Sequence, residues 1–117
     1  MAAPNIINAT TITGKTSGLA VTTSASAIVS NAAGSNKVLK LNALYCSNVS
    51  ASNGWVTVDV FKNATTAFEI AYQITVPTNA TLDVLSQPVY LEENDSLRLT
   101  ANANTTIEAV CSYEDIS

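Results

Sequence analysis

Short stretches in which apolar and polar residues alternate, bounded by turn-forming clusters, recur along the chain and constrain its fold most strongly. The clearest stretch spans residues 67–76, and its apolar members are Phe68, Ile70, Tyr72, Ile74 and Val76. A period of two places successive side chains on opposite faces of a β-strand. We therefore expect a strand here, with these five side chains on one buried face and the opposite face in water.

The same alternation predicts strands in residues 37–48, 55–62, 96–102 and 107–114. Weaker candidates are residues 6–12, 19–23, 27–31 and 81–91, the last interrupted at Pro88. Proline lacks an amide hydrogen, which indicates a sheet edge or a bend there. Gly, Asn, Asp and Ser clusters between these segments predict turns, among them Thr13-Gly14-Lys15, Ala33-Gly34-Ser35-Asn36, Lys62-Asn63, Pro77 to Ala80 and Glu92 to Asp95.

Eight or nine short strands without helical periodicity favour an all-β fold, a β-sandwich or jelly roll of about eight short antiparallel strands. The chain has 117 residues, which suits one domain with one core. We expect residues 1–117 to form that single domain, with residues 1–12 able to extend as an N-terminal arm. The first residues lack the basic and apolar regions of a signal peptide, so we expect a protein made in the cytoplasm and not exported.

The two cysteines lie in different predicted strands. In residues 37–48 the stronger apolar row consists of Leu39, Leu41, Ala43 and Tyr45, which leaves Cys46 on the other face. Cys111 falls on the apolar face of residues 107–114. Unless a bulge intervenes, the two thiols face apart. We expect both to remain buried thiols in a reducing compartment, while a single disulfide stays open as the alternative.

The residues that usually perform catalysis are missing or isolated. The chain has no histidine, the most common general base and a frequent metal ligand. Gly14-Lys15-Thr16 ends like a phosphate-binding loop, but Ala9 stands where the motif requires glycine, so we expect a hairpin turn. Asn94-Asp95-Ser96 resembles an esterase serine block without a base for Ser96. The sequence therefore predicts no enzyme, no catalytic residue and no cofactor.

Three groups of side chains could bind a ligand. The net charge is −4 and the basic residues are scattered along the sequence, which argues against nucleic acid as a partner. The basic residues are Lys15, Lys37, Lys40, Lys62 and Arg98. A group of acidic residues could ligate a hard cation such as calcium. It comprises Glu92, Glu93 and Asp95, with Asp83, Glu114 and Asp115. Because these residues lack the spacing of a calcium-binding loop, we expect solvated charges in turns and no metal. Five aromatics could stack on sugars but do not cluster in sequence, so we expect packing; they are Tyr45, Trp55, Tyr72, Tyr90 and Tyr113.

Charged residues make up only 12% of the chain, so few side chains are available to keep exposed strand edges from pairing with other chains. Such edges suit a protein that lies within an assembly. The opening residues 1–16 (MAAPNIINATTITGKT) and the closing residues 90–117 (YLEENDSLRLTANANTTIEAVCSYEDIS) resemble small virion structural proteins of tailed bacteriophages, especially cyanophages. Where that family tends to carry Gly, this chain has Asn94, which also tolerates a left-handed turn conformation.

The resemblance implies a β-sandwich incorporated into the virion and supplies no catalytic residue. Its leading implication is a capsid decoration or cement protein that binds the major capsid protein or another virion component and stabilises the phage head. A homo-oligomer within the particle is expected, with neither nucleic acid nor membrane as partner. A neck, tail or baseplate adaptor is the alternative placement, and a carbohydrate-binding module for host recognition is a further alternative.

Overall fold

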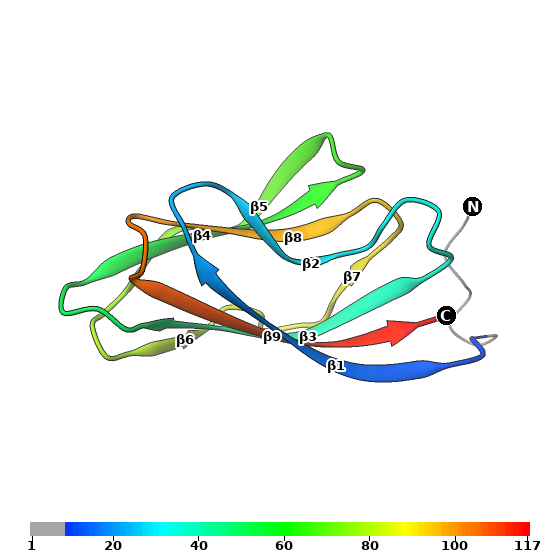
Figure 1. Ribbon diagram of the computed structural model, residues 1–117, viewed down its shortest axis with the longest axis horizontal. Coiled ribbons are helices and arrows are strands. Elements are labelled where there is room, and N and C mark those ends of the chain that lie inside the picture. The colour runs from blue at the N-terminus through cyan, green and yellow to red at the C-terminus, as the bar shows by residue number, and fades with distance from the viewer. Residues whose placement is uncertain (1–8) are drawn as a thin grey trace.

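The computed structural model describes residues 9–117, which form two antiparallel sheets packed face to face (Figure 1). Residues 1–8 lie outside the described part, and with them residues 6–8 of the predicted strand 6–12 and most of the predicted arm. Of the described residues of that predicted strand, 9–12, only Ile12 lies in a strand. Among the described residues, none belongs to a helix that could cross a lipid bilayer. The nine strands are β1 (Ile12–Val21), β2 (Ser26–Ser30), β3 (Val38–Asn48), β4 (Gly54–Lys62), β5 (Thr66–Val76), β6 (Thr81–Asp83), β7 (Val89–Leu91), β8 (Ser96–Ala101) and β9 (Ile107–Ile116).

The strand order confirms the predicted all-β sandwich. Sheet A has the order β1-β9-β3-β6, with β7 also paired to β3, and sheet B has the order β2-β8-β4-β5. The antiparallel pairs are therefore nested along the chain: β1 with β9, β2 with β8, β3 with β6 and β7, and β4 with β5. If β6 and β7 are taken as one strand interrupted before Val89, this is the eight-stranded pattern of a jelly roll.

The core lies between the inner faces of the two sheets and follows the predicted alternation where strand pairing is regular. In β8, Leu97, Leu99 and Ala101 are buried, and in β9, Ile107, Ala109 and Cys111 are buried. In β4, Val56 and Val58 are buried and Val60 packs against the core. Each large apolar side chain removed from water contributes about 1.5–3 kcal/mol. This burial holds the two sheets together.

The predicted buried face of β5 is wrong. Val76 is buried and Ile74 packs against the core, but Phe68, Ile70 and Tyr72 are exposed. Relative to β4, β5 contains extra residues at two register shifts, between Val56 and Val58 and between Val58 and Asp59. The first extra residue reverses the inside–outside alternation and the second restores it, so Phe68 lies opposite the core-packed Val60 and is nevertheless exposed. Ala71, which was expected to face water, therefore packs against the core instead.

A bulge also changes β3. The register with β9 shifts between Leu41 and Ala43, so Leu44 and Cys46 enter the core while Tyr45 is exposed. Cys46 and Cys111 therefore both face the core rather than facing apart. This arrangement is the one expected from the sequence when a bulge intervenes in residues 37–48.

The predicted turn at Thr13-Gly14-Lys15 is wrong, because these residues lie within β1 and Gly14 pairs with Glu114. Ten pairs between β1 and β9 continue without a shift, and this long ladder outweighs the local turn preference of glycine. Other predicted turns do require left-handed backbone: φ is 59° at Asn36, 61° at Asn79 and 70° at Asn94. The expectation that Asn94 tolerates a left-handed turn conformation is confirmed.

Candidate functional surfaces

The β5 edge exposes three large apolar side chains. Phe68 is 59% exposed, Ile70 38% and Tyr72 65%. The strand is the last in sheet B, so one side of its backbone has no partner strand among the described residues, and its hairpin with β4 projects from the body (Figure 1). At the first register shift Tyr72 and Gln73 together lie opposite Thr57, which faces outward because Val56 and Val58 face the core, so Tyr72 lies on the outer side of sheet B. Ile70, the extra residue at the second shift, is exposed beside it. The result is an apolar edge of a kind that soluble proteins usually cover or charge.

Beside this edge, the outer face of sheet B holds an ion pair within the subunit. Arg98 donates to Asp59 from Nε at 2.9 Å and from a terminal nitrogen at 3.4 Å. Its guanidinium lies 3.9 Å from the centre of the Phe61 ring. Asp59 is buried, and Trp55 lies on the same face because Val56 faces the core. Pairing neutralises both charges, but the same face also carries polar groups, because Thr57 pairs with Thr100 and the exposed Glu69 lies opposite Asp59.

The outer face of sheet A carries a second apolar group. Tyr45 and Val110 are directly opposite across β3 and β9, and both are exposed. On its other side, Val110 pairs with Gly18 of β1. A hollow of about 260 Å³ lies here, lined by Gly18, Leu19, Ala20, Glu108, Ala109 and Val110. The small side chains of β1 leave this space open.

The structure divides the five candidate sugar-stacking aromatics among three places. Tyr72 and Trp55 share the outer face of sheet B, whereas Tyr45 and Tyr90 share the outer face of sheet A, since Tyr90 pairs with Lys40. Tyr113 packs against the core and lines a different pocket. The five do not form one platform. The bulges in β3 and β5 decided this distribution, and no residue pattern in the sequence marks them.

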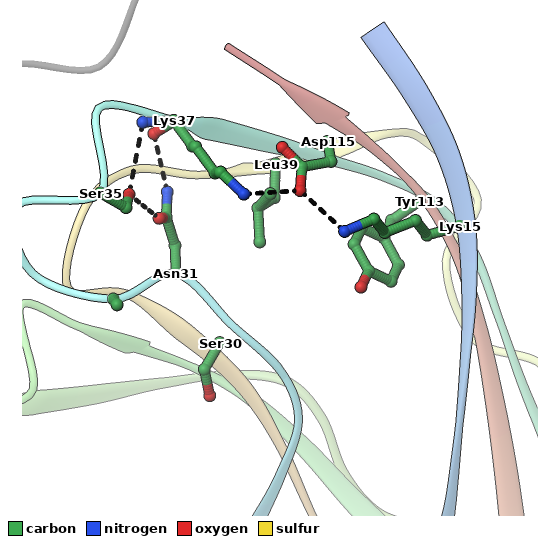
Figure 2. A pocket seen from close by; sticks show the side chains of 9 residues that line it. Lys15, Ser30, Asn31, Ser35, Lys37, Leu39, Tyr113 and Asp115 are labelled. Carbon is green, nitrogen blue, oxygen red and sulfur yellow. Dashed lines mark hydrogen bonds and ion pairs between the residues drawn. The ribbon is translucent and has the colours of Figure 1, made fainter.

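A polar pocket of about 240 Å³ opens where β1, β3 and β9 meet the loop after β2 (Figure 2). Lys15 of β1 and Lys37, the residue before β3, both donate to Asp115 Oδ2 at 3.1 Å. Burial alone would raise the pKa of Asp115, but the hydrogen bonds from the two lysines lower it below its usual value. The shared carboxylate of β9 ties β1 to the loop that leads into β3 at this end of sheet A.

This triad predicts a loss of stability in acid. The folded-state pKa of Asp115 lies below its unfolded value of about 3.9, so its contribution is complete above that value and is lost as pH falls through the folded pKa. We expect Asp115→Asn to lower the thermal midpoint at pH 7, and the gap to the unmodified protein to close below about pH 4. Asp83→Asn, at an exposed position in β6, serves as control. A gap that stays constant down to pH 2 would contradict the prediction.

The predicted acidic group is dispersed. Asp95 accepts from Lys62 Nζ at 2.6 Å and from the backbone N–H groups of Asn63 and Glu92 at 2.8 and 3.0 Å. Burial alone would raise the pKa of Asp95, but the hydrogen bonds from Lys62 and the two backbone groups lower it. Asp83 lies on β6, while Glu114 and Asp115 lie on β9. Within residues 9–117, no three His, Cys, Asp or Glu side chains are grouped to hold a metal ion.

The residues of the phosphate-loop-like and esterase-like motifs lie in strands. Lys15 and Thr16 lie within β1, where the backbone is extended, so they form no loop around a phosphate. Ser96 is the first residue of β8 and pairs with Phe61 of β4. Sequence reasoning missed Asn31 and Asn48, two buried asparagines that each organise a group of loops. Their only signal was a position at the end of a predicted strand.

Both cysteines are buried and free. Cys46 pairs with Ala109, and Leu44 pairs with Cys111, so the thiols are diagonal neighbours. Diagonal residues lie roughly 7–8 Å apart, beyond the usual reach of a disulfide without a shift of the backbone. Burial raises the pKa of Cys46 to about 12 and that of Cys111 to about 11.

These thiols should therefore be unreactive in the folded protein. We expect iodoacetamide at pH 8 to leave the native chain unmodified and to alkylate both cysteines in denaturant, because only the exposed thiolate reacts. Intact mass would be measured over time under both conditions. Rapid modification of the native chain at either position would show that the core opens easily and would contradict the burial.

No protein-family model matches the chain, and no curated protein matches it either. A structural match is a chain from Bacillus endospore appendages, which are described as forming a novel family of disulfide-linked pili. Its TM-score is 0.57 at 12% sequence identity, and the match covers 100% of this chain and 96% of that one. The likeness shows that the two chains share a fold.

Proposed function

We propose that this protein is a non-enzymatic structural module that takes part in a larger assembly through its outer faces and strand edges. The observation that carries the proposal is the β5 edge, where Phe68, Ile70 and Tyr72 are exposed together. A partner that removes these exposed aromatic and aliphatic side chains from water would stabilise the complex. A partner on this edge would also satisfy its free backbone groups.

The assembly that we propose is a bacteriophage particle, with this chain on the head as a decoration protein. The support is the resemblance of residues 1–16 and 90–117 to virion structural proteins, together with a jelly-roll topology, which viral capsid domains use widely. A decoration protein strengthens a shell by burying surface across neighbouring subunits. The major capsid protein would be its partner, and the virion its location.

The likeness to the Bacillus appendage chain favours a second candidate, a subunit of a fibre, because those appendages are described as pili. Their description as disulfide-linked does not transfer readily to this chain, since Cys46 and Cys111 are both buried. A fibre of this protein would have to be held by non-covalent contacts. A neck or tail position in a virion is compatible with such a fibre.

The test is to locate the chain in purified particles by mass spectrometry and electron microscopy. A copy number in the hundreds on the head lattice supports decoration, while a few copies at one vertex or on the tail would exclude it. Free filaments without particles would favour the fibre. Tyr72→Ser should reduce incorporation at least tenfold, whereas Val49→Ser, which removes an exposed apolar side chain outside both sheets, should leave incorporation unchanged.

A further inference from the structure

Two different apolar patches lie on opposite outer faces of the sandwich. The β5 patch consists of Trp55, Ile70 and Tyr72 on sheet B, and the β9 patch consists of Gly18, Ala20, Tyr45 and Val110 on sheet A. Since the sheets pack through their inner faces, the two patches point away from each other and cannot meet within one molecule (Figure 1). A second copy, however, can bring one patch against the other.

The two patches differ in shape in a complementary way. Tyr72 is the most exposed of the large apolar side chains of the described residues, at 65%. The β9 patch contains the hollow of about 260 Å³ beside Gly18 and Ala20, with Glu108 at its rim. An aromatic ring fills such a space with apolar contact, and a tyrosine hydroxyl can donate a hydrogen bond to a rim carboxylate.

The outer faces are large enough for a specific contact. The described residues extend over 47 × 26 × 19 Å, with the two sheets stacked one above the other and the strands along the longest direction (Figure 1). The rectangle that bounds one outer face, 47 × 19 Å, covers on the order of 900 Å², so a contact that used most of that face would approach the roughly 800 Å² per partner that a stable interface buries.

We propose that copies of this protein stack head to tail, with the β5 patch of one copy on the β9 patch of the next and Tyr72 in the hollow beside Gly18. The inference rests on the proposed structural role and names a second copy as the partner. Because the two patches differ, each added copy leaves one of each kind free. The contact therefore builds an open row instead of a closed dimer.

Two variants each disable one patch. Tyr72→Ser removes the ring that enters the hollow. Gly18→Leu fills the hollow without disturbing the subunit, since a Cβ at Gly18 would meet only the Ala109 carbonyl oxygen, at 3.8 Å. We expect the unmodified chain to grow past dimer mass as its concentration rises, and more so in salt, which screens the net charge of −4. Each variant alone should remain monomeric in sedimentation and light scattering.

Mixing the two variants is the decisive experiment. Tyr72→Ser keeps an intact β9 patch and Gly18→Leu keeps an intact β5 patch, so an equimolar mixture should form 1:1 pairs at twice the mass of one chain and stop there. Pairing in the mixture also shows that both variants are folded, and Val49→Ser should assemble like the unmodified chain. If the mixture stays monomeric, or if either variant alone still forms chains or a symmetric dimer, the head-to-tail contact is wrong.

Failure of the head-to-tail contact would not by itself disprove the proposed structural role. An unmodified chain that stays monomeric at all concentrations but is found at high copy number on particles would retain the structural role and lose the self-contact. Head-to-tail rows in solution, combined with absence of the chain from particles, would support the self-contact and contradict the role in the particle. The two outcomes are therefore distinguishable from one set of purified proteins and one particle preparation.

Discussion

Replacing Asp95 with alanine should lower the free energy of unfolding by about 2–4 kcal/mol, because two backbone N–H groups lose their acceptor at roughly 1–3 kcal/mol each. Those groups belong to Asn63 and Glu92, and Lys62 loses its 2.6 Å partner in the same change. The carboxylate thus joins the turn after β4 to the turn before β8. Urea unfolding followed by tryptophan fluorescence would measure the effect at Trp55.

The matched control uses the other carboxylate on the same lysine. Glu92 accepts from Lys62 at 3.1 Å, but its side chain is 71% exposed. An exposed ion pair contributes only about 0–1 kcal/mol, so Glu92→Gln should change the stability little. Equal effects of the two substitutions would mean that the charge of Lys62, rather than the buried backbone contacts of Asp95, sets the stability of this end.

Replacing Asn48 with alanine should also cost about 2–4 kcal/mol, since its buried side chain satisfies four polar partners whose loss leaves some of them unpaired. The amide nitrogen donates to the Ser52 and Val76 carbonyls at 2.8 Å each. The amide oxygen accepts from the backbone N–H and the hydroxyl of Ser50 at 2.9 and 2.7 Å. One side chain therefore holds the β3–β4 loop against the end of β5.

The size of the side chain can be separated from its hydrogen bonds. Asn48→Asp keeps the volume but turns an oxygen toward the two carbonyls, so it should destabilise the chain at neutral pH about as much as alanine does. Asn53→Ala removes an exposed amide that accepts one bond, from the Thr78 N–H, and should cost less than about 1 kcal/mol. Full stability of Asn48→Asp would mean that packing alone explains the role of Asn48.

Asn31 performs the same task at the other end of the sandwich. Its amide donates to the carbonyls of Lys37 and Leu91 at 2.8 and 3.0 Å and accepts from the Ser35 hydroxyl. The backbone of Asn31 also pairs with Asp95 and Asn94. A buried asparagine thus organises the loops at each end. Neither residue could be singled out from the sequence, where asparagine is common in every turn, because the partners come from segments that are distant along the chain.

The arm predicted for residues 1–12 stays a prediction over residues 1–8, which lie outside the described part. Its last residues are held by their own chain: the backbone N–H groups of Thr10 and Thr11 donate to the Ser117 carbonyl, at 2.7 and 2.9 Å. Ile12 then begins β1 opposite Ile116. Any strand added to a neighbouring subunit would therefore have to come from residues before Thr10.

The sequence by itself determined the class of fold and the inner faces of β4, β8 and β9, because a period of two holds wherever strands pair without interruption. It also located the left-handed turns at Asn36, Asn79 and Asn94, since that conformation has a local steric cause. Only the tertiary structure decided which side chains of β3 and β5 face outward. One extra residue in a ladder reverses every side chain beyond it, and its position depends on the partner strand rather than on local sequence. Tyr45, Ile70 and Tyr72 became surface residues in that way.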